Sequence, residues 1–317
     1  MPLEPLPSSS TSDAPTFSPR VIGALAAVYL IWGSTYLALR YVIEGLPPLM
    51  SGGARYLVAG AVLLVILRVR GAKMPTAREW AYSVPVGALM FLGGNGLVAL
   101  AEREVASSLA AVVCAAMPLF AAGLSVAIGE RPTLRQWSGL LLGFAGVAVM
   151  SLGELRATPG AALLLLCAPI GWATGSLAAR RLPLPKGLMA ASTQMIGGGI
   201  VTLVAGALRG ETIPAHAPTK ALVALAYLVV FGSLVAFSAY TYLLRSTTAP
   251  VAMSYAYVNP VIAVIMGVAI GAERLSSGTI LGGVLVVAGV AVIVMSKGKG
   301  AAAASVAPSP LTARAHR

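Results

Sequence analysis

Ten long apolar runs dominate this chain of 317 residues. They cover about residues 21–39, 48–67, 80–100, 105–128, 136–152, 159–179, 187–208, 220–243, 250–271 and 277–295. A helix needs roughly 20 apolar residues to cross a bilayer, and the runs lack the alternation that marks the strands of membrane barrels. The sequence therefore predicts an all-α integral membrane protein with ten transmembrane helices.

The composition agrees with a chain whose surroundings are mostly lipid. Hydrophobic residues make up 58% of the chain and charged residues only 10%, too few charges to cover the surface of a soluble enzyme. The net charge of +12 comes mainly from Lys and Arg spread over short links, so membrane orientation explains it better than nucleic-acid binding. Cys114 and Cys167 are isolated, and we expect both to be small buried residues.

The cations in the links predict the orientation of the chain. With the N-terminus in the cytoplasm, the cytoplasmic segments hold 15 of the 22 Lys and Arg residues and the external segments hold 6, while Arg55 lies within a span. Cytoplasmic loops normally carry the excess of cations, so we expect both termini inside. Residues 1–19 and 297–317 are rich in small residues and proline and are expected to be disordered cytoplasmic tails.

The second half of the chain repeats the first. Trp32 matches Trp172 and Pro118 matches Pro260, at offsets of 140 and 142 residues. Each half, 20–153 and 154–296, holds five spans, an odd number, so the halves must enter the membrane from opposite sides. Inverted repeats of this kind build many secondary transporters, in which a central site opens to each side in turn.

Arg55 is the sharpest polar feature of the apolar runs. It lies several residues inside the second run, where a cation is costly without a partner or a water-filled cavity. It would contact an anionic group such as a carboxylate, or else snorkel to lipid head groups or pair with a structural carboxylate. Gln194 occupies the matching place in the second half. Glu102, just after the third run, is the candidate for proton coupling and would otherwise be a solvated loop charge.

Other polar and aromatic side chains lie in the middle of the runs and are candidates to line a cavity. Tryptophan usually lies at the membrane interface, and an amide inside lipid needs a partner or water. With Arg55, the candidates for substrate binding are Trp32, Thr35, Tyr36, Asn95, Trp172, Ser176, Tyr240, Tyr255 and Asn259. Each of them could equally serve ordinary helix packing.

Catalytic and nucleotide-binding motifs are missing from the sequence. It has no phosphate-binding Gly-Lys-Ser/Thr loop and no His-Glu-x-x-His, and its two histidines lie in a loop and a tail. We therefore expect no enzyme activity, no metal and no cofactor. A passive channel is a weaker alternative, because it would not need matched helices interrupted by proline. Glycines in the fifth and tenth runs fit close helix packing, within a monomer or across a homodimer.

Three stretches of the chain resemble the drug/metabolite transporter superfamily, and most closely its EamA-domain bacterial exporters. These are IWGSTYLALR at Ile31–Arg40, GNGL at Gly94–Leu97 followed by Ala101 and Glu102, and the twin Glu-Arg pairs at 130–131 and 273–274. The resemblance covers residues 20–296 and implies a bacterial inner-membrane carrier whose ten helices surround a central cavity. It adds Met117 to the candidate cavity residues. It also implies export of a small metabolite, for which we expect an amino acid, by alternating access, with multidrug or toxic-compound efflux as the alternative.

Overall fold

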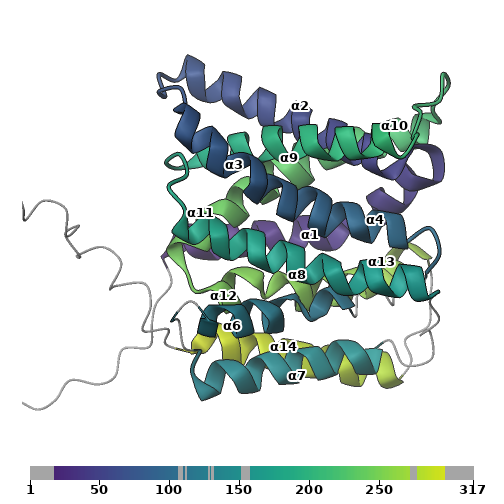
Figure 1. Ribbon diagram of the computed structural model, residues 1–317. Helices are drawn as coiled ribbons and strands as arrows, with labels where there is room; N and C mark the ends of the chain where they lie inside the picture. Colours follow the sequence, from purple (N-terminus) through teal and green to yellow (C-terminus); the bar gives the residue numbers. More distant parts are fainter. Residues whose placement is uncertain are drawn as a thin grey trace, which may run out of the picture.

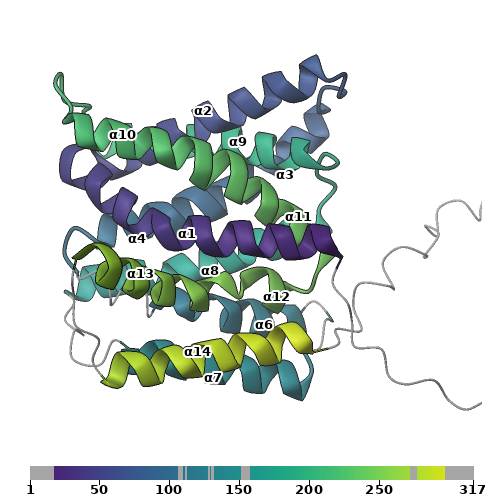
Figure 2. The same cartoon turned by 180° about the vertical axis from the view of Figure 1, so that it is seen from behind.

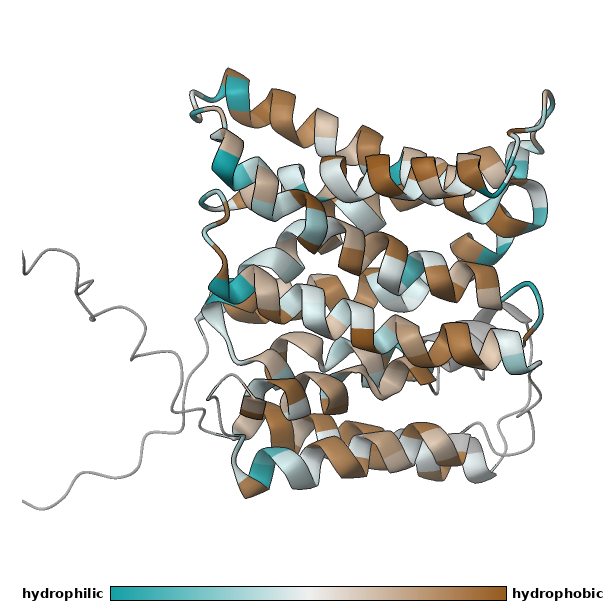
Figure 3. Cartoon of the chain, viewed as in Figure 1, coloured by the Kyte–Doolittle hydropathy of each residue, from teal (hydrophilic) through white to brown (hydrophobic). Residues whose placement is uncertain are grey.

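A computed structural model describes residues 18–105, 110, 113–127, 129, 132–150, 158–271 and 277–296. All regular secondary structure within these residues is helical. The helices lie side by side and run between two opposite ends of the molecule (Figures 1 and 2). Hydrophilic residues gather toward these two ends, whereas the lengths between them are mainly hydrophobic (Figure 3). This distribution is typical of a helical membrane protein and agrees with the predicted all-helical membrane fold.

The first repeat contributes helices on both sides of a short π-helical segment. Its elements are α1 (Pro19–Gly45), α2 (Pro48–Val69), α3 (Ala77–Met90), the π-helix η1 (Phe91–Gly96), α4 (Leu97–Ala101), α6 (Met117–Ala127) and α7 (Leu134–Met150). The segment η1 joins α3 and α4 into one continuous helical stretch.

The second repeat has the same plan. Its elements are α8 (Pro159–Arg181), α9 (Leu188–Leu208), α10 (Thr219–Tyr227), the π-helix η2 (Leu228–Phe237), α11 (Ser238–Ser246), α12 (Ala249–Met253), α13 (Tyr255–Gly271) and α14 (Ser277–Met295). Again a π-helix lies inside the third helical stretch of the repeat. The helices α1 and α8, which open the two repeats, run in opposite directions (Figure 1).

Six helical stretches in the described part of the chain are long and apolar enough to cross a membrane. They are Pro19–Gly45, Pro48–Val69, Ala77–Ala101, Pro159–Arg181, Leu188–Leu208 and Thr219–Ser246. Local signals explain several of their ends. Thr76 and Glu79 form a capping box at the start of α3. The helices α2 and α9 end two residues before Gly71 and Gly210, whose φ angles of 84° and 73° favour glycine.

Glycines allow the closest helix contacts. The helix α2 packs along α9, and α7 packs along α14 (Figure 1). A Cβ atom on Gly146 would lie 2.7 Å from the carbonyl oxygen of Gly282, so only glycine permits this approach of α7 to α14. The predicted role of the fifth and tenth runs in close packing therefore agrees with the structure, although Gly283 faces open space.

One sequence prediction is partly wrong, and two others concern residues that the structure does not describe. The prediction that both cysteines are buried is right for Cys114 and wrong for Cys167, which is exposed on the apolar surface of α8, where lipid would cover it. The tail residues 1–17 and 297–317 lie outside the described residues, as do Glu130 and Glu273 of the twin Glu-Arg pairs.

Candidate functional site

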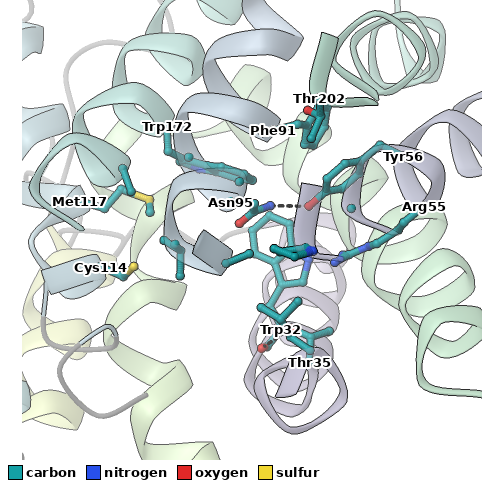
Figure 4. Close-up of a pocket in the computed structure, with 18 of the residues that line it drawn as sticks. Trp32, Thr35, Arg55, Tyr56, Phe91, Asn95, Cys114, Met117, Trp172 and Thr202 are labelled. Atoms are coloured by element: carbon teal, nitrogen blue, oxygen red, sulfur yellow. Dashed lines mark hydrogen bonds between the residues drawn. The ribbon is translucent and has the colours of Figure 1, made fainter. Parts of the chain in front are cut away.

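A pocket lies between the two repeats and takes its walls from both of them (Figure 4). Its lining includes Trp32, Thr35, Leu39, Pro48, Gly52, Arg55, Tyr56, Phe91, Gly94, Asn95, Gly96, Val98, Ala99, Cys114, Met117, Ala168, Trp172, Thr202, Tyr255, Ala256 and Asn259. Apart from Cys114, which precedes α6, these residues belong to the second half of α1, the start of α2, the segment η1–α4, and parts of α6, α8, α9 and α13. The pocket therefore lies toward the end of the molecule at which α1 and α4 end (Figure 1).

An aromatic cluster forms the floor of the pocket. The ring of Trp32 lies 5.7 Å from that of Trp172 and 4.5 Å from that of Tyr255, measured between centroids, with edge-on geometry that aromatic pairs prefer. The indole N–H of Trp32 donates to the carbonyl oxygen of Gly232 at 2.9 Å, and that of Trp172 donates to the Tyr240 hydroxyl at 3.1 Å. Both matched tryptophans are thus fixed by bonds that cross between helices.

Arg55 contributes the only cation among the lining residues. Its Nε donates to Ser233 Oγ in η2 at 2.8 Å, and its guanidinium carbon lies 4.8 Å from the centre of the Tyr56 ring. Within the described residues, no carboxylate lies within 4.0 Å of the guanidinium. A Cβ atom on Gly232 would lie 2.6 Å from Arg55 Nη2, so glycine at that position leaves room for the cation. The charge of Arg55 is therefore available to a ligand.

Two asparagines place amides in the pocket from different repeats. The Asn95 amide, from η1, donates to the hydroxyl of Tyr56 (Figure 4). Asn259, on α13, is 2% exposed, and its Oδ1 accepts no hydrogen bond. A buried acceptor without a donor is costly, so this oxygen is suited to a ligand that brings an N–H group. Met117 completes this side, with its sulfur 3.3 Å from the Tyr255 hydroxyl.

The two π-helical segments supply one polar residue of the pocket and hydrogen-bond partners of two others. The segment η1 supplies Asn95 and the lining residue Phe91, and η2 supplies Ser233 and the Gly232 carbonyl that bind Arg55 and Trp32. A π-helix inserts a residue into the helical register, which turns later side chains to a new face and frees backbone carbonyls. Segments of this kind often occur at functional sites.

Glu102 lies just beyond the pocket, one turn after the lining residues Val98 and Ala99. Its Oε1 is buried and accepts no hydrogen bond. Burial raises the pKa of the Glu102 carboxyl to about 7, because the charged form is desolvated. This carboxyl therefore changes its charge close to neutral pH.

The structure brings eight of the predicted site residues together around the pocket: Trp32, Thr35, Arg55, Asn95, Met117, Trp172, Tyr255 and Asn259. Ser176 and Tyr240 do not line it, because their hydroxyls bond to each other at 2.8 Å beneath the tryptophans. Tyr36 belongs to α1, but its side chain is not among those described. Sequence reasoning missed Tyr56, Phe91 and Thr202, and it treated Cys114 as packing.

Comparisons with known proteins fit this architecture. The model of the "EamA-like transporter family" matches residues 20–152 and again residues 159–295. The "Uncharacterized inner membrane transporter YedA" of Escherichia coli (strain K12) is 42% identical over 258 residues, which are 81% of this chain and 84% of that protein. A "Probable terminal-alkyne amino-acid exporter" of Streptantibioticus cattleyicolor is 26% identical over 86% of this chain and 93% of its own length. A solved crystal structure with 20% identity superposes with a TM-score of 0.70 over 86% of this chain and 95% of its own.

Proposed function

The chain belongs to the EamA-like transporter family, and from this premise we propose that it exports small zwitterionic metabolites, amino acids above all, by alternating access. It is an integral membrane transporter, and we place it in the bacterial inner membrane, as its relative YedA is named. We further propose ten spans in two inverted repeats, 20–153 and 154–296, with both termini in the cytoplasm.

The observation that carries the substrate class is the cation of Arg55 in a mainly apolar pocket. A cation inside a membrane is expensive unless it is paired or hydrated, and the described residues offer it a hydroxyl and an aromatic ring but no carboxylate. A carboxylate on the substrate would supply the missing charge in a bidentate arrangement that suits guanidinium. The proposal therefore assigns the substrate carboxylate to Arg55.

The rest of the pocket suits the other parts of an amino acid. The unpaired Oδ1 of Asn259 can accept from an ammonium group, and Trp32, Trp172 and Tyr255 can contact an apolar side chain. The relative from Streptantibioticus cattleyicolor, named as an amino-acid exporter, supports this class of substrate. The aromatic floor also favours a second candidate, efflux of larger amphipathic compounds that carry a carboxylate.

Several observations support the proposed topology. The family model matches the chain twice, α1 and α8 run in opposite directions, and each repeat carries a π-helix in its third helical stretch. Two repeats related in this way can exchange conformations, so that a pocket open toward one side closes and reopens toward the other. Glu102 is the residue to which we assign proton coupling, if transport is coupled.

Counterflow in liposomes tests the proposed function. Purified full-length protein is reconstituted into liposomes loaded with an unlabelled neutral amino acid, and uptake of the radiolabelled form is followed. Saturable uptake that requires internal substrate supports an amino-acid carrier. Uptake that is linear in substrate concentration indicates a channel, and uptake of amphipathic carboxylates but not of amino acids favours the efflux alternative. If neither amino acids nor amphipathic carboxylates are taken up, the proposed function is refuted.

A further inference from the structure

The two ends of the helical bundle are held in different ways. At the end where α8 and α11 finish, Nη1 of Arg180 donates to the carbonyl oxygens of Leu244 and Thr247, at 3.0 and 2.7 Å. The last carbonyls of a helix have no partner within the helix, and a cation there also interacts favourably with the helix dipole. Arg180 thus ties the end of α8 to the end of α11.

Neighbouring contacts close the same end. Nη2 of Arg245 donates to the carbonyl oxygen of Pro185 at 2.9 Å, and the hydroxyls of Tyr29 and Ser254 share a hydrogen bond of 2.5 Å. Leu243 and Met253 are fully buried beside these contacts. This end, defined by Arg180, Arg245, Tyr29 and Ser254, is the sealed end. The pocket lies toward the opposite end, which we call the open end.

An arginine stands at the matching place of the open end. Arg40 follows Trp32 by eight residues, just as Arg180 follows Trp172 by eight residues. Among the described residues, Arg40 bonds to no other helix. Its Nε donates to Glu44 Oε1, one turn further along α1, at 3.3 Å, and its side chain is 69% exposed. An exposed pair of this kind is weak, so Arg40 can exchange Glu44 for another partner.

The end of α4 offers that partner. The helix α4 stands in the first repeat where α11 stands in the second. The carbonyl oxygens of Leu100 and Ala101 at its end accept backbone N–H groups of the residues that follow, and a cation beside them would interact favourably with the helix dipole. Glu102 follows directly, and one of its oxygens is buried without a donor. A guanidinium brought to this place would contact both the helix end and the carboxylate.

We infer that Arg180 and Arg40 are matched gate residues, which close the sealed end and the open end in turn. In the present conformation Arg180 binds the end of α11 and Arg40 rests on Glu44. When the molecule opens its sealed end, Arg180 releases α11 and Arg40 binds the end of α4. The inference rests on the proposed alternating access and extends it to two residues that touch no substrate.

Spin-label distances across the open end test the inference without any substrate. In full-length protein with Cys114→Ala and Cys167→Ser, cysteines at Ile43 and Arg103 carry the labels, and the protein is studied in lipid nanodiscs. Arg180→Gln removes the cation from the sealed end. We expect a new, shorter distance, with its population raised on the order of tenfold, because the lost bonds are charge-assisted. Arg70→Gln, an exposed arginine at the end of α2, is the matched control and should leave the distances unchanged.

The double variant Arg40→Gln/Arg180→Gln tests the second gate residue. Without Arg40 the shorter distance should disappear or lose most of its population. Arg180→Lys, which keeps the charge, should restore much of the original distribution and shows that the site still folds. The inference is wrong if Arg180→Gln matches Arg70→Gln, or if the shorter distance persists without Arg40. If the distances change as expected but the liposome assay shows no amino-acid counterflow, the amino-acid substrate is refuted and the gate residues are not.

Discussion

The second helix of each repeat packs against the π-helix of the other repeat, and these two second helices differ at one matched position. Between α2 and η2 the residue is Arg55, which bonds to Ser233 and lines the pocket. On α9 it is Gln194, which is 1% exposed and is not among the residues that line that pocket. The same helical frame therefore holds a cation that lines the pocket in one repeat and a buried neutral residue in the other.

Glycine allows α9 to pack closely against α3 and η1. A Cβ atom on Gly198 of α9 would lie 2.4 Å from the carbonyl oxygen of Gly87 and 2.5 Å from the ring of Phe91. No such contact exists for Gly52 of α2, which borders the pocket and faces open space. The pocket therefore lies beside the less crowded of the two helices.

The largest expected effect comes from crowding the tight interface. Gly198→Ala places a methyl group against backbone atoms of α3 that cannot move away alone, so we expect a loss of about 3 kcal/mol in the free energy of unfolding. Thermal unfolding in detergent measures it. Gly23→Ala, at a position with nothing within 4 Å, is the control. Equal melting temperatures for the two variants would show that this interface is not close-packed.

Replacing the arginine that lines the pocket by the residue type at the matched position of the second repeat should abolish most transport without unfolding the protein. Arg55→Gln makes α2 resemble α9 at the matched position, and the loss of a charge-assisted contact should lower amino-acid counterflow by roughly 10- to 100-fold. Gln194→Leu is the matched control. It removes a buried Nε2 that has no acceptor, so flux should stay normal. Equal losses of flux in both variants would mean that the asymmetry has no role in binding.

Asn259 should contribute less than Arg55, because it is neutral. Asn259→Leu removes the unpaired acceptor, and we expect amino-acid affinity to fall by about tenfold or less. An N-acetylated amino acid, which lacks the ammonium group, should bind the variant and the original protein alike. Competition for counterflow measures both ligands. If Asn259→Leu weakens both ligands equally, Asn259 does not bind the ammonium group.

Much of this arrangement could be predicted from the sequence, and the failures have physical reasons. Trp32, Trp172, Asn95 and Asn259 were found because polar or aromatic groups inside apolar runs need a cavity or a partner. Tyr240 carries the same signal, but Ser176 and Trp172 satisfy its hydroxyl within the packing.

The missed residues gave no comparable signal. Phe91 and Thr202 are ordinary in a membrane helix, and Tyr56 was hidden beside Arg55. Phe91 lies in the π-helix η1, and a shift of one residue in register leaves little trace in a uniformly apolar run. The glycine-rich stretch Gly93–Gly96 was the one hint of η1.

The smallest expected effect concerns pH. Burial raises the pKa of Glu102 from its ordinary value of 4.5 to about 7, so the folded protein keeps a proton that the unfolded chain releases between these values. Its contribution to stability is therefore greatest at low pH and declines as the pH rises from 4.5 to 7. Melting temperatures across this window should fall more for the original protein than for Glu102→Gln. Parallel curves would show that Glu102 titrates normally.

Ligand binding to Arg55 tests the central claim most directly. Calorimetry compares the affinity of an amino acid with that of its amide, which lacks the carboxylate, for the original protein and for Arg55→Gln. The account predicts that the original protein prefers the acid by at least about tenfold and that Arg55→Gln binds acid and amide alike. An unchanged preference for the acid in Arg55→Gln would contradict the account.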